Sequence, residues 1–85
     1  MGKKEKLIQK LLSEPKDFTF DEAVTLLGYF SYTQSNKGKT SGSRVAFSNP
    51  NSPVKIIMHK PHPRNVLLEY QVKQLIDQLR QEGLI

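Results

Sequence analysis

The chain of 85 residues contains no cysteine. This absence excludes disulfide bonds, thiol nucleophiles, iron–sulfur ligands and thiolate zinc sites. Its two histidines, His59 and His62, are too few for a dedicated transition-metal cage, so we expect no metal and no other cofactor. The length predicts a single domain of residues 1–85, because chains usually divide into several cores only beyond about 250 residues.

Acidic residues are missing from the middle of the chain. Residues 23–68 contain no Asp or Glu, although the net charge of the whole chain is only +5. The seven basic and eight acidic residues outside this stretch nearly cancel, so the positive excess belongs to the middle half. Such a field attracts a polyanion, and a merely solubilising surface is the alternative. The basic residues of the stretch, which we take as candidate RNA contacts, are Lys37, Lys39, Arg44, Lys55, Lys60 and Arg64.

Targeting signals are not evident either. The segment Met1-Gly2-Lys3-Lys4-Glu5-Lys6 is charged, and no apolar run of signal-peptide length follows it. It does not fit the myristoylation pattern, since Lys6 stands where that pattern needs Ser or Thr. With no exit signal, no membrane segment and no cysteine, we expect a cytoplasmic protein.

Hydrophobic spacing predicts three helices. Apolar residues at helical intervals indicate a first helix over residues 3–13, which ends before Pro15. Thr19 and Glu22 have the spacing of a capping box and predict the start of a second helix, which Gly28 is placed to end in a left-handed conformation. A third helix is expected over residues 69–82, with Gly83 as its stop.

Between the second and third helices the sequence predicts three strands, over residues 29–35, 43–48 and 54–59. Alternation in the second strand sends Val45 and Phe47 to one face and Arg44 and Ala46 to the other. For the third strand, the inward set is either Val54, Ile56 and Met58 or the set that contains Ile57. Short connections favour an antiparallel meander with helices on one face, so the predicted class is α+β, a three-stranded antiparallel sheet packed on helices.

Two segments invite a catalytic interpretation. Gly38-Lys39-Thr40 resembles the end of a phosphate-binding P-loop, but the first glycine of that motif and the helix after it are missing. The histidines are more informative, because a metal-independent ribonuclease needs an acid, a base and cations near the phosphate. His59 and His62, with Lys60, Arg64 and Arg44, supply those types of group. The structural alternative is that His59 merely ends a strand and His62 is a solvated loop residue.

Several strings in this order resemble the HicA family of bacterial toxins. They are Leu26-Leu27-Gly28-Tyr29, Gly42-Ser43-Arg44-Val45-Ala46-Phe47 and Gln81-Glu82-Gly83-Leu84-Ile85, and the resemblance covers about Asp21 to Ile85. It implies a fold like that of double-stranded-RNA-binding domains, in the order αβββα, and ribonuclease activity on mRNA opposite a HicB-type antitoxin. Residues 1–17 then add an N-terminal helix to a HicA-like part of residues 20–85.

The chain departs from the family at one position. Where the family string has Gly-Ser-His, with the histidine taken as catalytic, this sequence has Gly42-Ser43-Arg44. Arginine stays protonated and cannot act as a general base, although it can bind phosphate or stabilise a phosphorane-like transition state. We therefore expect an RNA-binding, toxin-like protein in which proton transfer, if it occurs, falls to His59 or His62. The alternatives are a catalytically inactive nucleic-acid-binding module and a protein-binding domain for an acidic partner.

Overall fold

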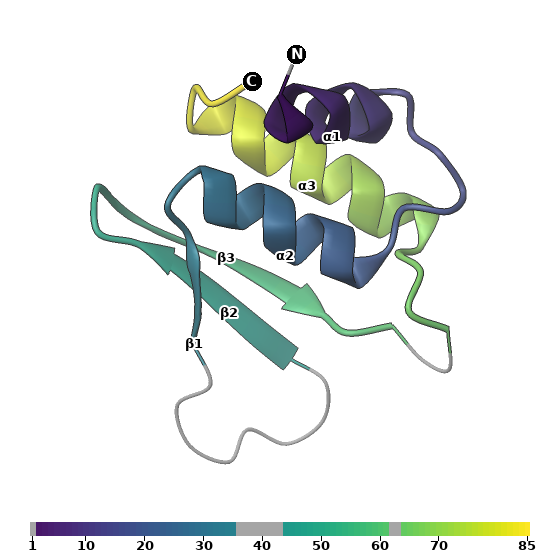
Figure 1. The fold of residues 1–85 in the computed structure, drawn as a ribbon. Coiled ribbons are helices and arrows are strands. Elements are labelled where there is room, and N and C mark those ends of the chain that lie inside the picture. The colour runs from purple at the N-terminus through teal and green to yellow at the C-terminus, as the bar shows by residue number, and fades with distance from the viewer. Residues whose placement is uncertain (1, 36–43, 62–63) are drawn as a thin grey trace.

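Three helices and a three-stranded sheet form the described part of the computed structural model, which covers residues 2–35, 44–61 and 64–85, with the backbone alone at positions 35, 44 and 54 (Figure 1). The predicted α+β class is confirmed, and after the first helix the order of elements is helix, three strands, helix. The elements in chain order are α1 (Lys3–Leu12), α2 (Phe20–Tyr29), β1 (Thr33–Ser35), β2 (Arg44–Asn49), β3 (Ser52–His59) and α3 (Glu69–Gln81).

The sheet is the antiparallel meander that short connections favour. Its strand order is β1-β2-β3, so β2 is central and β3 is an edge strand of eight residues. Helices α2 and α3 lie over one face of the sheet, and α1 packs against both helices on the side away from the sheet (Figure 1). Among the described residues, no helix lies on the other face of the sheet (Figure 1).

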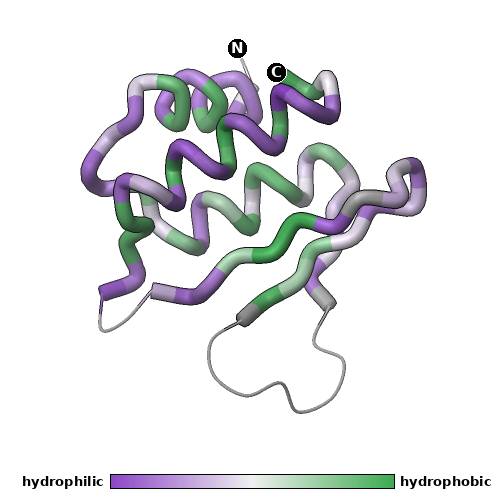
Figure 2. Tube along the Cα trace, turned by 180° about the vertical axis from the view of Figure 1, so that it is seen from behind, coloured by the Kyte–Doolittle hydropathy of each residue, from purple (hydrophilic) through white to green (hydrophobic). Residues whose placement is uncertain are grey.

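The core lies between the sheet and α2 with α3. Val45 and Phe47 of β2 are buried, as the alternation predicts, and Phe47 lies beside Phe20 with ring centroids 6.4 Å apart. Ile56 and Met58 of β3 are also buried, whereas Ile57 is 45% exposed. This settles the open choice for the third strand in favour of the set with Ile56 and Met58. Hydrophobic segments of the helices and strands face one another across this core (Figure 2).

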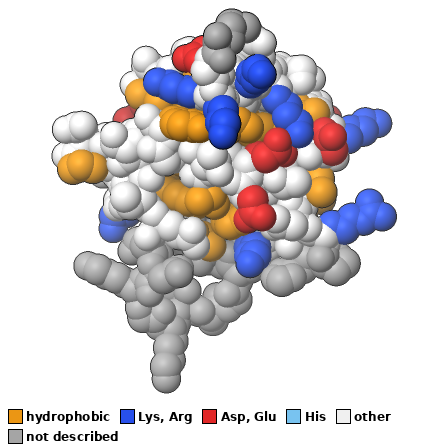
Figure 3. Space-filling model, viewed as in Figure 1, with side chains coloured by type: hydrophobic (Ala, Val, Ile, Leu, Met, Phe, Trp, Pro, Cys, Tyr) orange, Lys and Arg blue, Asp and Glu red, His pale blue; other side chains and the backbone are white. Residues whose placement is uncertain are grey.

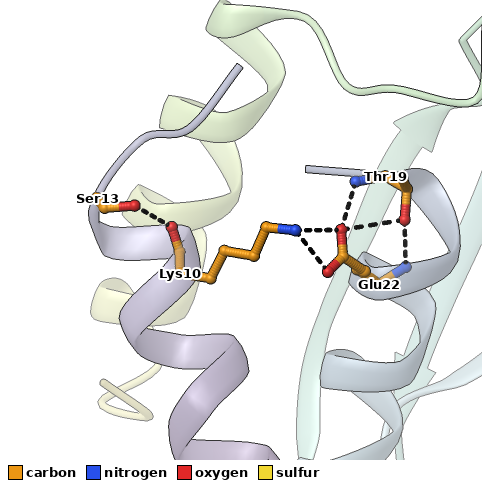
Figure 4. A network of polar contacts seen from close by, with 4 residues as sticks. All are labelled: Lys10, Ser13, Thr19 and Glu22. Carbon is orange, nitrogen blue, oxygen red and sulfur yellow. Dashed lines mark hydrogen bonds and ion pairs between the residues drawn. The ribbon is translucent and has the colours of Figure 1, made fainter. Parts of the chain in front are cut away.

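An ion pair joins α1 to α2, and its carboxylate also belongs to the N-terminal cap of α2. Thr19 and Glu22 form the predicted capping box: the Thr19 N–H donates to Glu22 Oε1 at 2.9 Å, and the Glu22 N–H donates to Thr19 Oγ1 at 3.1 Å. Lys10 Nζ of α1 donates to both carboxylate oxygens of Glu22, at 3.1 and 2.8 Å (Figure 4). The same carboxylate therefore caps α2 and anchors α1 to it.

The prediction that Gly28 ends the second helix is wrong. The helix continues to Tyr29, and Ser31 takes the left-handed conformation, with φ of 70°. The Tyr32 N–H donates to the Leu27 carbonyl and the Ser31 N–H to the Gly28 carbonyl, both at 3.0 Å, which is the hydrogen-bond pattern of a Schellman cap. This later ending lets Phe30 and Tyr32 turn into the core, where both are buried. The gain from burying two aromatic side chains outweighs the small strain of a left-handed serine.

The first strand is consequently shorter than predicted. Residues 29–32 belong to the end of α2 and its cap, and only Thr33–Ser35 pair with β2. At the other end of the chain Gly83 does stop α3, with φ of 72° and the Leu84 N–H donating to the Leu79 carbonyl at 2.9 Å. In the described ranges, no helix combines the length and the apolar character needed to cross a bilayer.

Candidate nucleic-acid interface

The face of the sheet that the helices leave uncovered carries alternate residues of β3. Because Ile56 and Met58 point into the core, Lys55, Ile57 and His59 occupy the opposite face, and all three are exposed. The β-strand period of two thus places one cation, one apolar side chain and one imidazole along a single row.

The register of the sheet brings two candidate catalytic positions together. Arg44 of β2 pairs with His59 of β3, at the end of the sheet where the chain leaves toward α3. Directly opposite residues in an antiparallel pair lie on the same face, with Cβ atoms about 4.5–5.5 Å apart. Arg44, the last residue of the string Gly42-Ser43-Arg44, therefore has a histidine as its cross-strand neighbour.

The backbone at His59 is held by Gln71, a residue outside the predicted site. Gln71 of α3 is buried, and its Nε2 donates to the His59 carbonyl at 2.7 Å while its Oε1 accepts from the Leu68 N–H at 2.9 Å. The Gln71 amide thus provides a hydrogen-bond partner both for the backbone N–H at the start of α3 and for the backbone carbonyl at the end of β3. A Gln three residues after a helix N-cap is half of the capping-box signal, and the other half is missing because Leu68 has no side-chain oxygen.

The remaining predicted contacts are only partly in the described residues. Lys60 and Arg64, in the irregular segment between β3 and α3, are both exposed, as is Lys55 on the sheet. Lys37, Lys39 and His62 lie outside the described residues, and Arg44 is placed by its backbone alone. The structure therefore groups Lys55, His59 and position 44 on one face, with Lys60 next along the chain.

The carboxylates are distributed differently from these cations. All eight belong to the helices, their caps or the α1–α2 connection, and acidic and basic side chains lie interspersed over the helical side of the molecule (Figure 3). Two of them come near the sheet: Glu82 accepts from Ser52 Oγ at 2.6 Å, and Asp77 faces a groove beside β3. Within the described ranges, no cluster of three His, Asp or Glu side chains suited to a metal ion is present.

That groove lies between β3 and α3 and has a volume of about 400 Å³. Its strand wall is the continuous stretch from Lys55 to His59, and its helix wall includes Tyr70, Gln74 and Gln78. These helix residues recur at intervals of four beside the buried apolar residues of α3, and no motif in the sequence marks them. The groove opens beside His59, so the groove and the uncovered sheet face share one border.

Comparisons with protein-family models, with curated proteins and with solved structures found no match to this chain.

Proposed function

We propose that this protein binds RNA through the uncovered face of its sheet and the basic segment that follows β3, as the toxin-like member of a toxin–antitoxin pair. The resemblance to HicA toxins supplies the biological class, and mRNA is the substrate that the resemblance implies. The chemistry of the surface supports the binding part independently of the resemblance.

The observation that carries the proposal is the separation of charge across the fold. Lys55 is exposed on the sheet, Lys60 is exposed directly after β3, and Arg64 is exposed in the segment before α3, while the stretch from residue 23 to residue 68 contributes no carboxylate. A side of the molecule with cations and little competing negative charge suits contacts to a phosphate backbone, which dominate the affinity of nucleic-acid complexes. Such contacts read the shape of an RNA more than its sequence.

Binding can be tested with substitutions matched in charge. We expect Lys55→Gln and Lys60→Gln to weaken the binding of a short double-stranded RNA, measured by fluorescence anisotropy at 50 mM salt. Lys6→Gln is the control, because it removes the same charge from α1, on the far side of the helical layer from the sheet. Equal losses in all three variants would indicate a nonspecific effect of net charge and would count against this face.

A second candidate function, RNA cleavage without metal, is favoured by the pairing of Arg44 with His59. An exposed imidazole on β3 can exchange a proton with the ribose hydroxyl or the leaving oxygen, and the arginine at position 44 can neutralise charge on the phosphate. In this proposal His59 and Arg44 together take the place of the histidine in the HicA-like string. If neither His59 nor His62 transfers a proton, the protein is an inactive binding module.

An RNA cleavage assay distinguishes the metal-independent ribonuclease from the inactive binding module. The wild type, His59→Ala and His62→Ala are incubated with mRNA in EDTA, and the products are resolved on a gel. Loss of cleavage in His59→Ala with retained RNA binding is the expected result for the enzyme. Cleavage that persists equally in both variants contradicts the histidine proposal, and no cleavage by the wild type favours the binding module. Growth arrest on expression, relieved by a neighbouring gene product, tests the toxin assignment.

A further inference from the structure

The groove between β3 and α3 exposes a strand edge to a binding partner, except at its end, where the His59 carbonyl already accepts from Gln71 Nε2. In the described residues β3 pairs with β2 along one edge, and no strand pairs along its other edge. Five consecutive residues of β3, from Lys55 to His59, line the groove on this side, and α3 forms the opposite wall.

We propose that this groove binds an extended acidic peptide segment of a partner protein, which adds to β3 as a fourth strand. An edge strand beside a helix is a known geometry for strand addition, in which backbone hydrogen bonds give affinity and alternate side chains give specificity. Five residues of β3 span about 16 Å at about 3.3 Å per residue, which is enough to pair with a short segment. This inference does not depend on RNA binding.

A second copy of the chain is a poor occupant on charge grounds. Antiparallel pairing of two β3 strands centred on Ile57 would place Lys55 of each copy opposite His59 of the other, with no carboxylate in either strand. Each copy also carries a net charge of +5. Lysine on an edge strand is a common device against pairing of identical edges, and Lys55 is exposed here.

The same charges define the chemistry of the segment that fits. Side chains of an added strand alternate between the uncovered sheet face, where Lys55 and His59 lie, and the side that faces α3. Carboxylates suit the first side, and Lys60 extends the positive charge beyond its end. Asp77 on the helix wall disfavours carboxylates on the second side, where Leu75 also lines the groove. The expected segment therefore alternates acidic and apolar residues.

A synthetic probe tests this proposal directly. The probe is an eight-residue peptide that alternates Glu and Val, with both ends blocked, and the control is the same peptide with Lys in place of Glu. Hydrogen exchange of the backbone amides is followed by NMR on the full chain. We expect the Glu/Val peptide to slow the exchange of every second amide of β3, because alternate amides of an edge strand point outward. The Lys/Val peptide should not.

Charge variants provide the second measurement. Lys55→Glu should weaken binding of the Glu/Val peptide about threefold to tenfold, the range expected when an exposed attraction becomes a repulsion. Lys60→Glu should act in the same direction and lies outside the strand, so it serves if Lys55→Glu disturbs folding. Lys6→Glu on α1 is the matched control and should leave binding unchanged.

Four results would overturn the proposal. One is that neither peptide slows exchange in β3, and another is that the two peptides slow it equally. A third is a dimer in sedimentation experiments whose β3 amides are already protected without peptide, which would assign the edge to a second copy. The fourth is protection of the same alternate amides by an RNA duplex, which would assign the groove to the nucleic acid. RNA that binds without protecting these amides is compatible with RNA on the sheet face and the peptide in the groove.

Discussion

At the scale of single residues, the carboxylate of Glu22 has the most consequences. Burial raises its pKa, but hydrogen bonds from Lys10 and Thr19 outweigh burial and hold the pKa below the usual range. For Lys10, the hydrogen bond to Glu22 raises the pKa more than burial lowers it. Both side chains are partly exposed, at 35% for Lys10 and 28% for Glu22, so the pair is screened by solvent and its contribution is moderate.

Replacing Glu22 with Gln should therefore isolate the ion pair. Glutamine preserves the shape of the capping box, and we expect the free energy of unfolding in urea at pH 7 to fall by about 0.5–1 kcal/mol. Because the pKa of Glu22 is lowered on folding, the pair stabilises the fold above the ordinary pKa of a glutamate and loses this effect as the pH falls through the lowered value. The difference between wild type and variant should thus shrink progressively below about pH 4.

Glu69→Gln is the matched control for this measurement. Glu69 pairs with Lys73 at 3.4 Å, but its side chain is 81% exposed. An exposed pair of this kind contributes at most a few tenths of a kcal/mol. If Glu22→Gln and Glu69→Gln lowered stability equally, the Lys10–Glu22 pair would have no special role in attaching α1.

At the scale of elements, α1 is part of the core and not an appendage. Leu11 of α1 is 0% exposed and belongs to the same apolar cluster as Leu26 of α2 and Leu79 of α3. Leu11→Ala should lower the free energy of unfolding by about 2–4 kcal/mol, because it leaves a cavity between three helices. Leu12→Ala, at a neighbouring position that is 40% exposed, should change it by about 0.5 kcal/mol or less, and urea denaturation followed by circular dichroism measures both. Similar values for the two variants would contradict this role of α1.

Elements were predictable from the sequence where local chemistry decides them. The capping box at Thr19 and Glu22, the glycine stop at Gly83 and the alternation of Val45 with Phe47 all rest on contacts within a few residues, and all are confirmed. The end of α2 was not predictable in this way. There, burial of Phe30 and Tyr32 against the rest of the core moves the left-handed residue from Gly28 to Ser31, and tertiary packing overrides the local preference of glycine.

In the candidate site, too, some features follow from the local sequence and others depend on tertiary structure. The cations, the two histidines and the departure at Arg44 are visible in the sequence, because they depend only on residue type. The pairing of Arg44 with His59 depends on a shift in the register of β2 and β3 between Phe47 and Asn49. Without that shift, the Asn49–Ser52 pairing at the turn would place Arg44 opposite Ile57. The groove beside β3 depends on how α3 crosses the sheet, and hydrophobic spacing along one helix does not encode that crossing.

At the scale of the whole molecule, the charge separation predicts how RNA binding responds to salt. Each phosphate that a cation contacts releases condensed counterions, so the logarithm of affinity falls with the logarithm of salt concentration in proportion to the number of contacts. Lys55, Lys60 and Arg64 provide three exposed candidates within the described residues. Three contacts correspond to a slope of about −2.7, so we expect the affinity for double-stranded RNA to fall about fortyfold between 50 and 200 mM salt.

The slope of this dependence also reports on individual residues. Lys60→Gln should reduce the slope by about one, because one phosphate contact is lost, whereas Lys6→Gln on α1 should leave it unchanged. Fluorescence anisotropy at four or more salt concentrations gives both slopes with the same RNA. An affinity independent of salt in the wild type would argue against any polyanion on this surface. A slope lowered equally by both substitutions would show that net charge, and not the sheet face, governs binding, since the two lysines differ in position and not in charge.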